Sequence, residues 1–573
     1  QHPSEVQKLI AEVLNCKLHK VVVDMRRMGG GFGGKETQAA QWACIAALLA
    51  KRNQCAVKLR LPRMQDMIAT GKRHPFENHY KVGFDKNGLI TAADIEINGN
   101  CGHSPDLSDA IVDRAMFHCD NGYYLENVNV AGHRCRTNQV SHTAYRGFGG
   151  PQGMIVAEAM MDAIARSVNK DPLTVRKLNL YGEHQRNVTP YGMTVEHNLL
   201  ADIISRLEDS SDYWPRRKSI NEFNKTNPII KKGLALTPVK FGISFTAKHL
   251  NQAGALLHVY TDGSMQINHG GTEMGQGLHT KIGQIVANEF GISLHDVEVT
   301  STRTDKVPNT SPTAASSGTD LNGKAAQNAC ITVKQRLAEF YAAEINRSDL
   351  TAEHVIFADN TVMLGEHSIG FVELIQNAYI GRVSLSSTGF YKTPKIHYDR
   401  STGNGRPFFY FAYGASVSEV AIDTLTGEYK VERVDILHDV GRSLNPAIDV
   451  GQIEGGFIQG MGWLTTEDLK WDENGRLISN NPATYKIPAI GDTPEIFNVD
   501  LYQRDNDEDS IYHSKAVGEP PFMLANSVWC ALKDAISSLT DYKQDPQLPV
   551  PATPEAVLKC IESLSNMSNS EHN

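Results

Sequence analysis

The sequence lacks the features that mark membrane, secreted and zinc-dependent proteins. It has no uninterrupted apolar run of about 20 residues, and the best candidate, WACIAALLA, has the length of a buried helix. Its nine cysteines are scattered with no CxxC pair, which fits neither a disulfide framework nor an iron–sulfur site. The 21 histidines include no HExxH motif of a zinc hydrolase. We therefore expect a soluble protein of the reducing cytoplasm, with no membrane span.

The sequence also lacks an excess of positive charge. The formal net charge is −9 over 573 residues, and no Lys/Arg-rich tract occurs. Because nucleic-acid binding normally requires a basic face, nucleic acid is not expected as a ligand. The composition, with 41% hydrophobic and 21% charged residues, is that of a globular protein, and the length predicts at least two domains.

Helix and strand patterns alternate along the chain, which predicts a mixed α+β fold. Two hairpins are expected, turning at Asn87-Gly88 and at Asp262-Gly263. The polar, charged segment 185–232 marks a domain junction, so we predict a first domain over 1–184, a helical connection over 185–232 and a second domain over 233–573. The apolar periodicity predicts strands at 20–25 and 55–61, and helices at 5–15, 36–52, 149–168, 324–345, 525–539 and 553–564.

Glycine-rich segments recur four times: GGGFGGKE (29–36), RGFGGPQG (146–153), GGTEMGQG (270–277) and GGFIQGMG (455–462). The first fits the GxxxxGK start of a phosphate-binding loop, but Glu36 stands where Ser or Thr must hold Mg²⁺, and its charge would repel phosphate. A nucleotidase is therefore excluded. We interpret the four segments as turns, several of them leading into helices, whose amides and glutamines bind a large heterocyclic cofactor.

Five motifs carry a resemblance to a known family: GGGFGGKE, TAYRGFGGPQG, GGTEMGQG, VPNTSPTAASSG and KAVGEPP, in this order. With them, essentially the whole chain resembles the molybdenum-binding part of xanthine dehydrogenase and oxidase. It is most similar to the bacterial form in which this part is a separate large subunit. The resemblance implies two elongated domains with a molybdopterin cofactor at their interface, the first domain being incomplete at its N-terminal end. It also implies a metal with oxo, sulfido and hydroxide ligands besides the pterin sulfurs.

The resemblance also implies roles for individual residues. Glu519, in KAVGEPP, matches the catalytic base. Glu36 and Arg114 match the pair that hydrogen-bonds a purine, Phe148 and Phe245 the rings that sandwich it, and Thr246 a further substrate contact. The other matching residues lie at the metal (Gln1, Phe32, Arg146, Ala315) and at the cofactor (Gln276, Gln459, Gly31, Ala314, Ser316).

Taken singly, several of these residues have ordinary structural explanations. A Glu before two prolines is most often a solvated turn residue, an Arg after Asp113 is most often in a surface ion pair, and each Phe is most often core. Within the five matching motifs we prefer the functional interpretation.

The expected activity is hydroxylation of hypoxanthine to xanthine and of xanthine to urate. The two electrons then require FAD and 2Fe–2S clusters on a partner subunit, because this chain has no segment for these groups. We expect NAD to be reduced there, although the sequence leaves the final acceptor open between NAD and O2. The resemblance suggests a heterotetramer with two copies of each subunit. Two alternatives stay open: an aldehyde oxidase-like hydroxylase, whose relatives tend to carry apolar residues in place of the Glu36 and Arg114 pair, and a non-catalytic scaffold.

Overall fold

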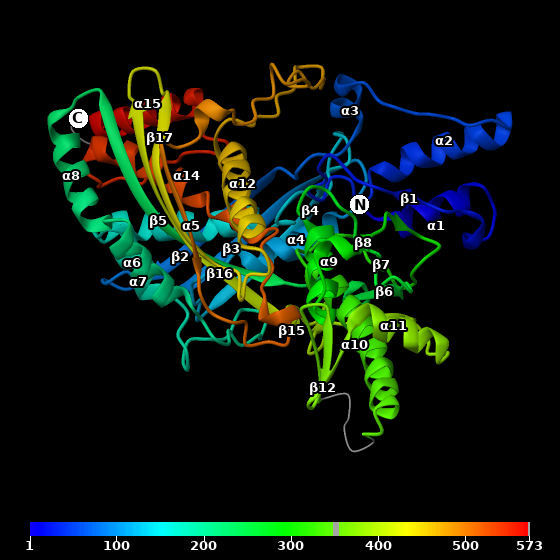
Figure 1. Cartoon of the computed structure of the whole chain (residues 1–573). Helices are drawn as coiled ribbons and strands as arrows, with labels where there is room; N and C mark the ends of the chain where they lie inside the picture. The colour runs from blue at the N-terminus through cyan, green and yellow to red at the C-terminus, as the bar shows by residue number, and fades with distance from the viewer. Residues whose placement is uncertain (348–353, 571–573) are drawn as a thin grey trace. The chain divides into compact units, whose positions relative to one another are not determined.

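The computed structural model describes residues 1–347 and 354–570 (Figure 1). The chain forms two compact units, each built from three separate segments. Unit 1 comprises Gln1–Arg60, Ala247–Ile396 and Glu508–Ser514, and unit 2 comprises Leu61–Thr246, His397–Asp507 and Lys515–Asn573. Each unit thus takes residues from both sides of the predicted junction at 185–232. The predicted domains, 1–184, 185–232 and 233–573, follow one another along the chain, and this division stays a prediction.

Unit 1 is organised around a four-stranded sheet in the order β13-β6-β7-β8. Its strands are β6 (Gln252–Val259), β7 (Met265–His269), β8 (Val297–Val299) and β13 (Ser386–Lys392). The helices α9 (Leu278–Phe290) and α10 (Gly318–Glu344) bury apolar side chains in this unit. The remaining elements of the unit are α1 (Pro3–Val13), β1 (Asp24–Met25), α2 (Ala39–Asn53), β9 (Thr302–Arg303), β10 (Val355–Ala358), β11 (Thr361–Leu364), β12 (His367–Gly370) and α11 (Phe371–Ile380).

Unit 2 contains a second four-stranded sheet, in the order β18-β17-β16-β5. Its strands are β5 (Ile230–Ile243), β16 (Tyr410–Asp423), β17 (Tyr429–Asp439) and β18 (Ile496–Tyr502). The long strand β5 lies at the edge of the sheet and pairs only with β16 within it. It carries Pro238, which fits an edge because proline has no N–H for a ladder bond. Helix α14 (Asn526–Ser537), with all its residues buried, packs on this sheet.

A three-stranded sheet completes unit 2, with β3 (Ile90–Gly102) between β2 (Phe76–Phe84) and β4 (Val128–Arg136). Its apolar residues form a core with α5 (Gly150–Ser167), most of whose residues are buried. The other elements are α3 (Arg63–Ala69), α4 (Ser108–His118), α6 (Pro172–Asn179), α7 (Leu200–Ser210), α8 (Tyr213–Thr226), β14 (His397–Asp399), β15 (Asn404–Arg406), α12 (Pro446–Thr465), α13 (Pro520–Met523) and α15 (Pro554–Ser570).

The structure confirms the two hairpins and the predicted helices, with ends shifted by a few residues. The strand predicted at 55–61 is wrong, because this segment pairs with no other strand among the described residues and stays irregular. Of the strand predicted at 20–25, only Asp24 and Met25 find a partner, in β9. An alternating pattern alone does not make a strand where no neighbouring strand supplies the hydrogen bonds. Within the described part of the chain, no helix combines the length and the apolar character needed to cross a membrane.

The segment GGFIQGMG (455–462) was predicted to be a turn. This prediction is wrong, because the segment lies inside α12. Its glycines allow close packing instead. A Cβ at Gly456 would lie 2.7 Å from Pro521, and one at Gly460 only 2.1 Å from the carbonyl oxygen of Phe522. Because Pro521 and Phe522 belong to α13, these glycines let α12 approach α13 more closely than any other residue would permit.

Candidate functional site

The predicted residues of unit 1 cluster around the side chain of Gln1. Its Oε1 accepts a hydrogen bond from the Gly33 N–H at 3.1 Å, and its Nε2 donates to the Thr313 carbonyl at 2.8 Å. The Gly30 N–H donates to the Met274 carbonyl at 3.2 Å. Three loops far apart in sequence, at 28–36, 272–277 and 313–317, are thereby joined. With Gln1 itself, these loops account for all eight residues predicted for this unit, the other seven being Gly31, Phe32, Glu36, Gln276, Ala314, Ala315 and Ser316.

These loops leave part of their backbone uncovered. A Cβ placed on Gly31 would collide with Met274 and Gln1, at 2.6 and 2.8 Å. Packing within the protein is therefore sufficient to require glycine at this position. A Cβ on Gly29 or Gly275 would meet no other described residue within 4 Å. The Gly275 N–H already donates to Glu273 at 2.8 Å, so what is open at these two glycines is the space that a side chain would fill, and a flat ligand such as a pterin would fit against it.

Two features of the loops are strained or unusually exposed. Ala315 and Ser316 both have positive φ, 55° and 56°, a conformation that costs energy for residues with a Cβ. Phe32 also has positive φ, 54°, and is 49% exposed, which is high for a large aromatic side chain. Glu36 is in contrast only 6% exposed.

The side chain of Gln276 stabilises the loop to which it belongs. Its Oε1 accepts a hydrogen bond from the Met274 N–H at 2.6 Å, and its Nε2 donates to the Thr272 carbonyl at 2.9 Å.

In unit 2, Arg146 joins three segments. Its Nε donates to the Gly518 carbonyl at 2.6 Å, its Nη2 to the Gln452 carbonyl at 3.1 Å, and its Nη1 to Oε1 of Gln459 at 3.3 Å. Burial lowers the pKa of Arg146 to about 10, against the opposing effects of Tyr145 and Glu519. The guanidinium nevertheless stays protonated at neutral pH. It fixes Gln459 of α12 against the loop that also carries Phe148, a half-buried residue at φ 50°.

Glu519 immediately precedes α13 and is half-buried rather than a solvated turn residue. Its Oε1 accepts a hydrogen bond from the Gly147 N–H at 3.1 Å, so the loop that carries Arg146 and Phe148 also orients this carboxylate. Its negative charge acts on both Arg114 and Arg146, where it opposes the lowering of the pKa by burial. The two arginines and the carboxylate therefore form one electrostatic group within unit 2.

Arg114, on α4, is 2% exposed and is not part of a surface ion pair. Its Nη1 donates to the Ser244 carbonyl at 2.9 Å, and its Nη2 donates to the Gly242 carbonyl. The guanidinium carbon also lies over the rings of Phe241 and Phe408, at 4.6 and 5.2 Å from their centroids. Phe245 and Thr246 follow Ser244 directly, so Arg114 holds the backbone that carries two other predicted substrate residues. Burial lowers its pKa.

Two residues of this group were missed by the sequence analysis. Tyr145 accepts a hydrogen bond at its hydroxyl from Nε2 of Gln459, at 2.6 Å. Arg73 stacks on the Tyr145 ring at 4.3 Å from its centroid, and donates to the Arg146 carbonyl at 2.8 Å. Tyr145 is adjacent to Arg146 in the motif TAYRGFGG and could have been noticed there. Arg73 lies outside all five motifs, and no spacing in the sequence connects it to the site.

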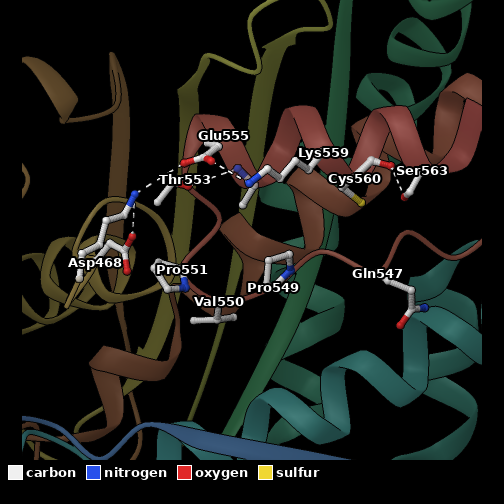
Figure 2. Close-up of a pocket in the computed structure, with 12 residues that line it drawn as sticks. Asp468, Gln547, Pro549, Val550, Pro551, Thr553, Glu555, Lys559, Cys560 and Ser563 are labelled. Atoms are coloured by element: carbon white, nitrogen blue, oxygen red, sulfur yellow. Dashed lines mark hydrogen bonds and ion pairs between the residues drawn. The ribbon is translucent and has the colours of Figure 1, made fainter. Parts of the chain in front are cut away.

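A hollow of about 420 Å³ lies elsewhere in unit 2 (Figure 2). Its charged groups pair with one another: Lys559 Nζ lies 2.7 Å from Glu555, and Lys470 Nζ lies 3.4 Å from Asp468 and 3.6 Å from Glu555. None of the predicted site residues lines it. In the described ranges, no cluster of three or more His, Cys, Asp or Glu side chains is arranged to hold a metal ion.

Most of the chain is similar to known proteins. Two family models, each described as a molybdopterin cofactor-binding domain, match residues 1–180 and 206–494. The chain is 45% identical over 571 residues to xanthine dehydrogenase/oxidase of Gallus gallus, and 44% identical over 577 residues to xanthine dehydrogenase of Oryza sativa subsp. japonica. Each alignment covers 99% of this chain but 40% of the relative, so the chain spans well under half of those proteins.

The fold is also found among solved structures. Quinoline 2-oxidoreductase from Pseudomonas putida 86 superposes with a TM-score of 0.86 at 21% identity, covering 98% of this chain and 71% of that one. Such low identity shows a shared mixed α+β fold and nothing finer. The family models together match more than three quarters of the chain, and the loops around Gln1 and Arg146 offer amides and glutamines rather than metal ligands. The chain belongs to the family of molybdopterin cofactor-binding domains.

Proposed function

We propose that this chain is the molybdenum-binding part of a xanthine dehydrogenase, which hydroxylates hypoxanthine to xanthine and xanthine to urate. One observation carries the proposal: in a chain nearly half identical to xanthine dehydrogenases, the two charged residues expected to bind a purine are both buried. Glu36 is 6% and Arg114 is 2% exposed. Charged groups held away from bulk water can orient a polar ligand, and this position suits ligand recognition better than a role in solubility.

The residues present fit a molybdopterin cofactor. We assign its binding to Gln276, Gly31, Ala314, Ser316 and Gln459, with Gln1, Phe32, Ala315 and Arg146 next to the metal. The open backbone at Gly29 and Gly275 supports this assignment. When bound, the cofactor supplies the redox chemistry of hydroxylation and takes up two electrons from the substrate.

The protein's own part in the reaction is orientation and proton transfer. Arg114 and Glu36 provide in-plane donors and acceptors for a purine, and Phe148 and Phe245 provide faces on which it stacks. Glu519 acts as the general base. The Gly147 N–H donates to its Oε1 and thereby orients this carboxylate. Thr246 adds a further contact to the substrate.

To complete the proposed catalytic cycle, the two electrons taken from the substrate must pass from this chain to an acceptor. We propose a partner subunit that carries FAD and 2Fe–2S clusters and passes the electrons to NAD, in a heterotetramer with two copies of each subunit, in the cytoplasm. The relatives in the comparison are about two and a half times as long as the matched segment, which leaves room for such groups outside it.

The test is co-expression with a candidate flavin and iron–sulfur partner, followed by metal analysis and a xanthine assay with NAD. Molybdenum near one atom per chain, a pterin released on denaturation and urate formation are the expected results. Absence of both molybdenum and pterin would favour a non-catalytic scaffold.

An aldehyde oxidase-like activity is the second candidate, and it is separable from the first. The double variant Glu36→Val, Arg114→Met should lose purine turnover far more than aldehyde turnover, because only the purine needs two polar partners. Loss of both activities to the same extent would contradict the assignment of a purine substrate.

A further inference from the structure

The outer edge of β5 is hydrogen-bonded by side chains instead of by another strand. Over positions 238–242, alternate residues of β5 direct their backbone groups away from β16, and these groups have partners on α4 and the turn after it. Asn121 donates to the Pro238 carbonyl at 2.9 Å and accepts from the Lys240 N–H at 3.1 Å. His118 Nε2 accepts from the Gly242 N–H at 3.1 Å, and Arg114 donates to the Gly242 carbonyl.

The spacing explains how three side chains can replace a strand. Arg114 and His118 are four residues apart on one face of α4, and Asn121 follows in the turn after the helix, so the three side chains meet the β5 edge at positions two residues apart. An edge strand otherwise exposes a row of unpaired N–H and C=O groups, which here would be buried at high cost. Arg114 therefore has a structural role at one end of this row, besides the role proposed for it with substrate.

Gly242 connects the structural role of Arg114 with the role proposed for Arg114 in substrate binding. Its N–H is fixed by His118 and its C=O by Arg114, so both sides of this residue are held by α4. The ring of His118 lies 4.6 Å from that of Phe241 and 5.3 Å from that of Phe408, the same two rings that lie under Arg114. A shift of His118 would consequently move the carbonyl that directs the guanidinium.

The hydrogen bonds also determine the protonation of His118. Because Nε2 accepts the Gly242 N–H, the proton of the neutral ring is on Nδ1, which donates to the Arg114 carbonyl at 3.0 Å. A protonated ring would place two donors against each other at Gly242. In agreement, burial lowers the pKa of His118 well below its usual value, and the charges of Arg114 and Lys240 act in the same direction.

We propose that His118 is a positioning residue for purine binding, which aligns the Arg114 guanidinium through the backbone of Gly242. The inference rests on the proposed function, since it assumes that Arg114 contacts the purine. His118 itself touches neither substrate nor cofactor in this role. Its effect should therefore be seen in the KM for purines, and much less in kcat or in molybdenum content.

Three substitutions of His118 separate this role from simple packing. His118→Phe keeps a ring against Phe241 and Phe408 but has no nitrogen. His118→Asn keeps a donor near the Arg114 carbonyl but is too short for Gly242, whereas His118→Gln places an amide oxygen near the former Nε2. We expect the KM for xanthine to rise about tenfold in the Phe and Asn variants, as for a lost buried hydrogen bond, and to be largely restored in the Gln variant.

The assays use the holoenzyme with its partner, and they include an aldehyde substrate, molybdenum content and thermal unfolding. His79→Phe, at a site with its side chain 62% exposed on β2, serves as the matched control and should behave as the unmodified protein. A wild-type KM for xanthine in the Phe variant would overturn the proposal. So would equal losses on xanthine and aldehyde, or equal losses in all three variants.

Arg114→Met distinguishes a failure of this inference from a failure of the proposed function. If Arg114→Met loses purine turnover while His118→Phe keeps a normal KM, only the role of His118 is wrong. If Arg114→Met keeps normal purine turnover, the substrate role of Arg114 is wrong, and the inference falls with it. In the Arg114→Met background, His118→Phe should add little further loss, because both changes remove the same contact.

Discussion

The contact between α12 and α13 makes a sharp prediction about Gly460. A Cβ at this position would lie 2.1 Å from the Phe522 carbonyl oxygen, whereas real Cβ contacts are not shorter than 3.0 Å. Gly460→Ala therefore requires the two helices to move apart by about 0.9 Å (3.0 − 2.1). Strain of this kind costs about 1–3 kcal/mol.

Gly451, in the same helix, is the matched control, because a Cβ there meets no other described residue within 4 Å. Gly451→Ala should stabilise the protein by about 1 kcal/mol, the usual helix penalty of glycine. The two variants should thus differ by about 2–4 kcal/mol in the free energy of unfolding. Chemical denaturation measures the difference. Equal stability of the two variants would refute the close approach of α12 to α13, and with it our explanation of the GGFIQGMG segment.

Further predictions concern the chemistry and the cofactor. Glu519→Gln should keep molybdenum content and fold but remove most xanthine turnover, because it preserves shape and deletes the proton acceptor; near wild-type turnover would show that Glu519 is not the base. Gln276→Ala and Gln459→Ala should each lower the molybdenum and pterin content of the purified protein. A full cofactor complement in either variant would remove that glutamine from the proposed binding set.

The sequence analysis predicted regular elements well where periodicity was long. The helix at 149–168 and both hairpins were found because apolar spacing and turn residues pointed to the same structure. It was wrong at 55–61, where a strand-like pattern has no partner in the described residues. It was also wrong at 455–462, since glycine marks a turn and a close helix contact equally well, and only the position of α13 decides between them.

At the candidate site, too, the sequence could predict one part of the structure and not another. The resemblance proposed the site residues, which stay predictions, but it could not indicate how these residues are held. Arg114 was recognised in the sequence beside Asp113, yet its hydrogen bonds go to β5, more than 120 residues away. The support from His118 and Arg73 is likewise long-range. Contacts of this kind arise from the packing of α4 against a sheet edge, which no local pattern records.

A last prediction concerns the glycine-rich loop at 29–36 and whether its backbone at Gly29 lies against the cofactor. Gly29 has no positive φ, and a Cβ there would meet no other residue of the described chain within 4 Å, so neither backbone conformation nor packing requires glycine. Gly29→Ala should change the free energy of unfolding by less than about 0.5 kcal/mol. If the loop approaches the cofactor, the same substitution should nevertheless lower molybdenum content. Gly491→Ala, equally open but outside every predicted loop, should change neither quantity. A full molybdenum content in Gly29→Ala would show that the uncovered backbone of this loop does not bind the cofactor.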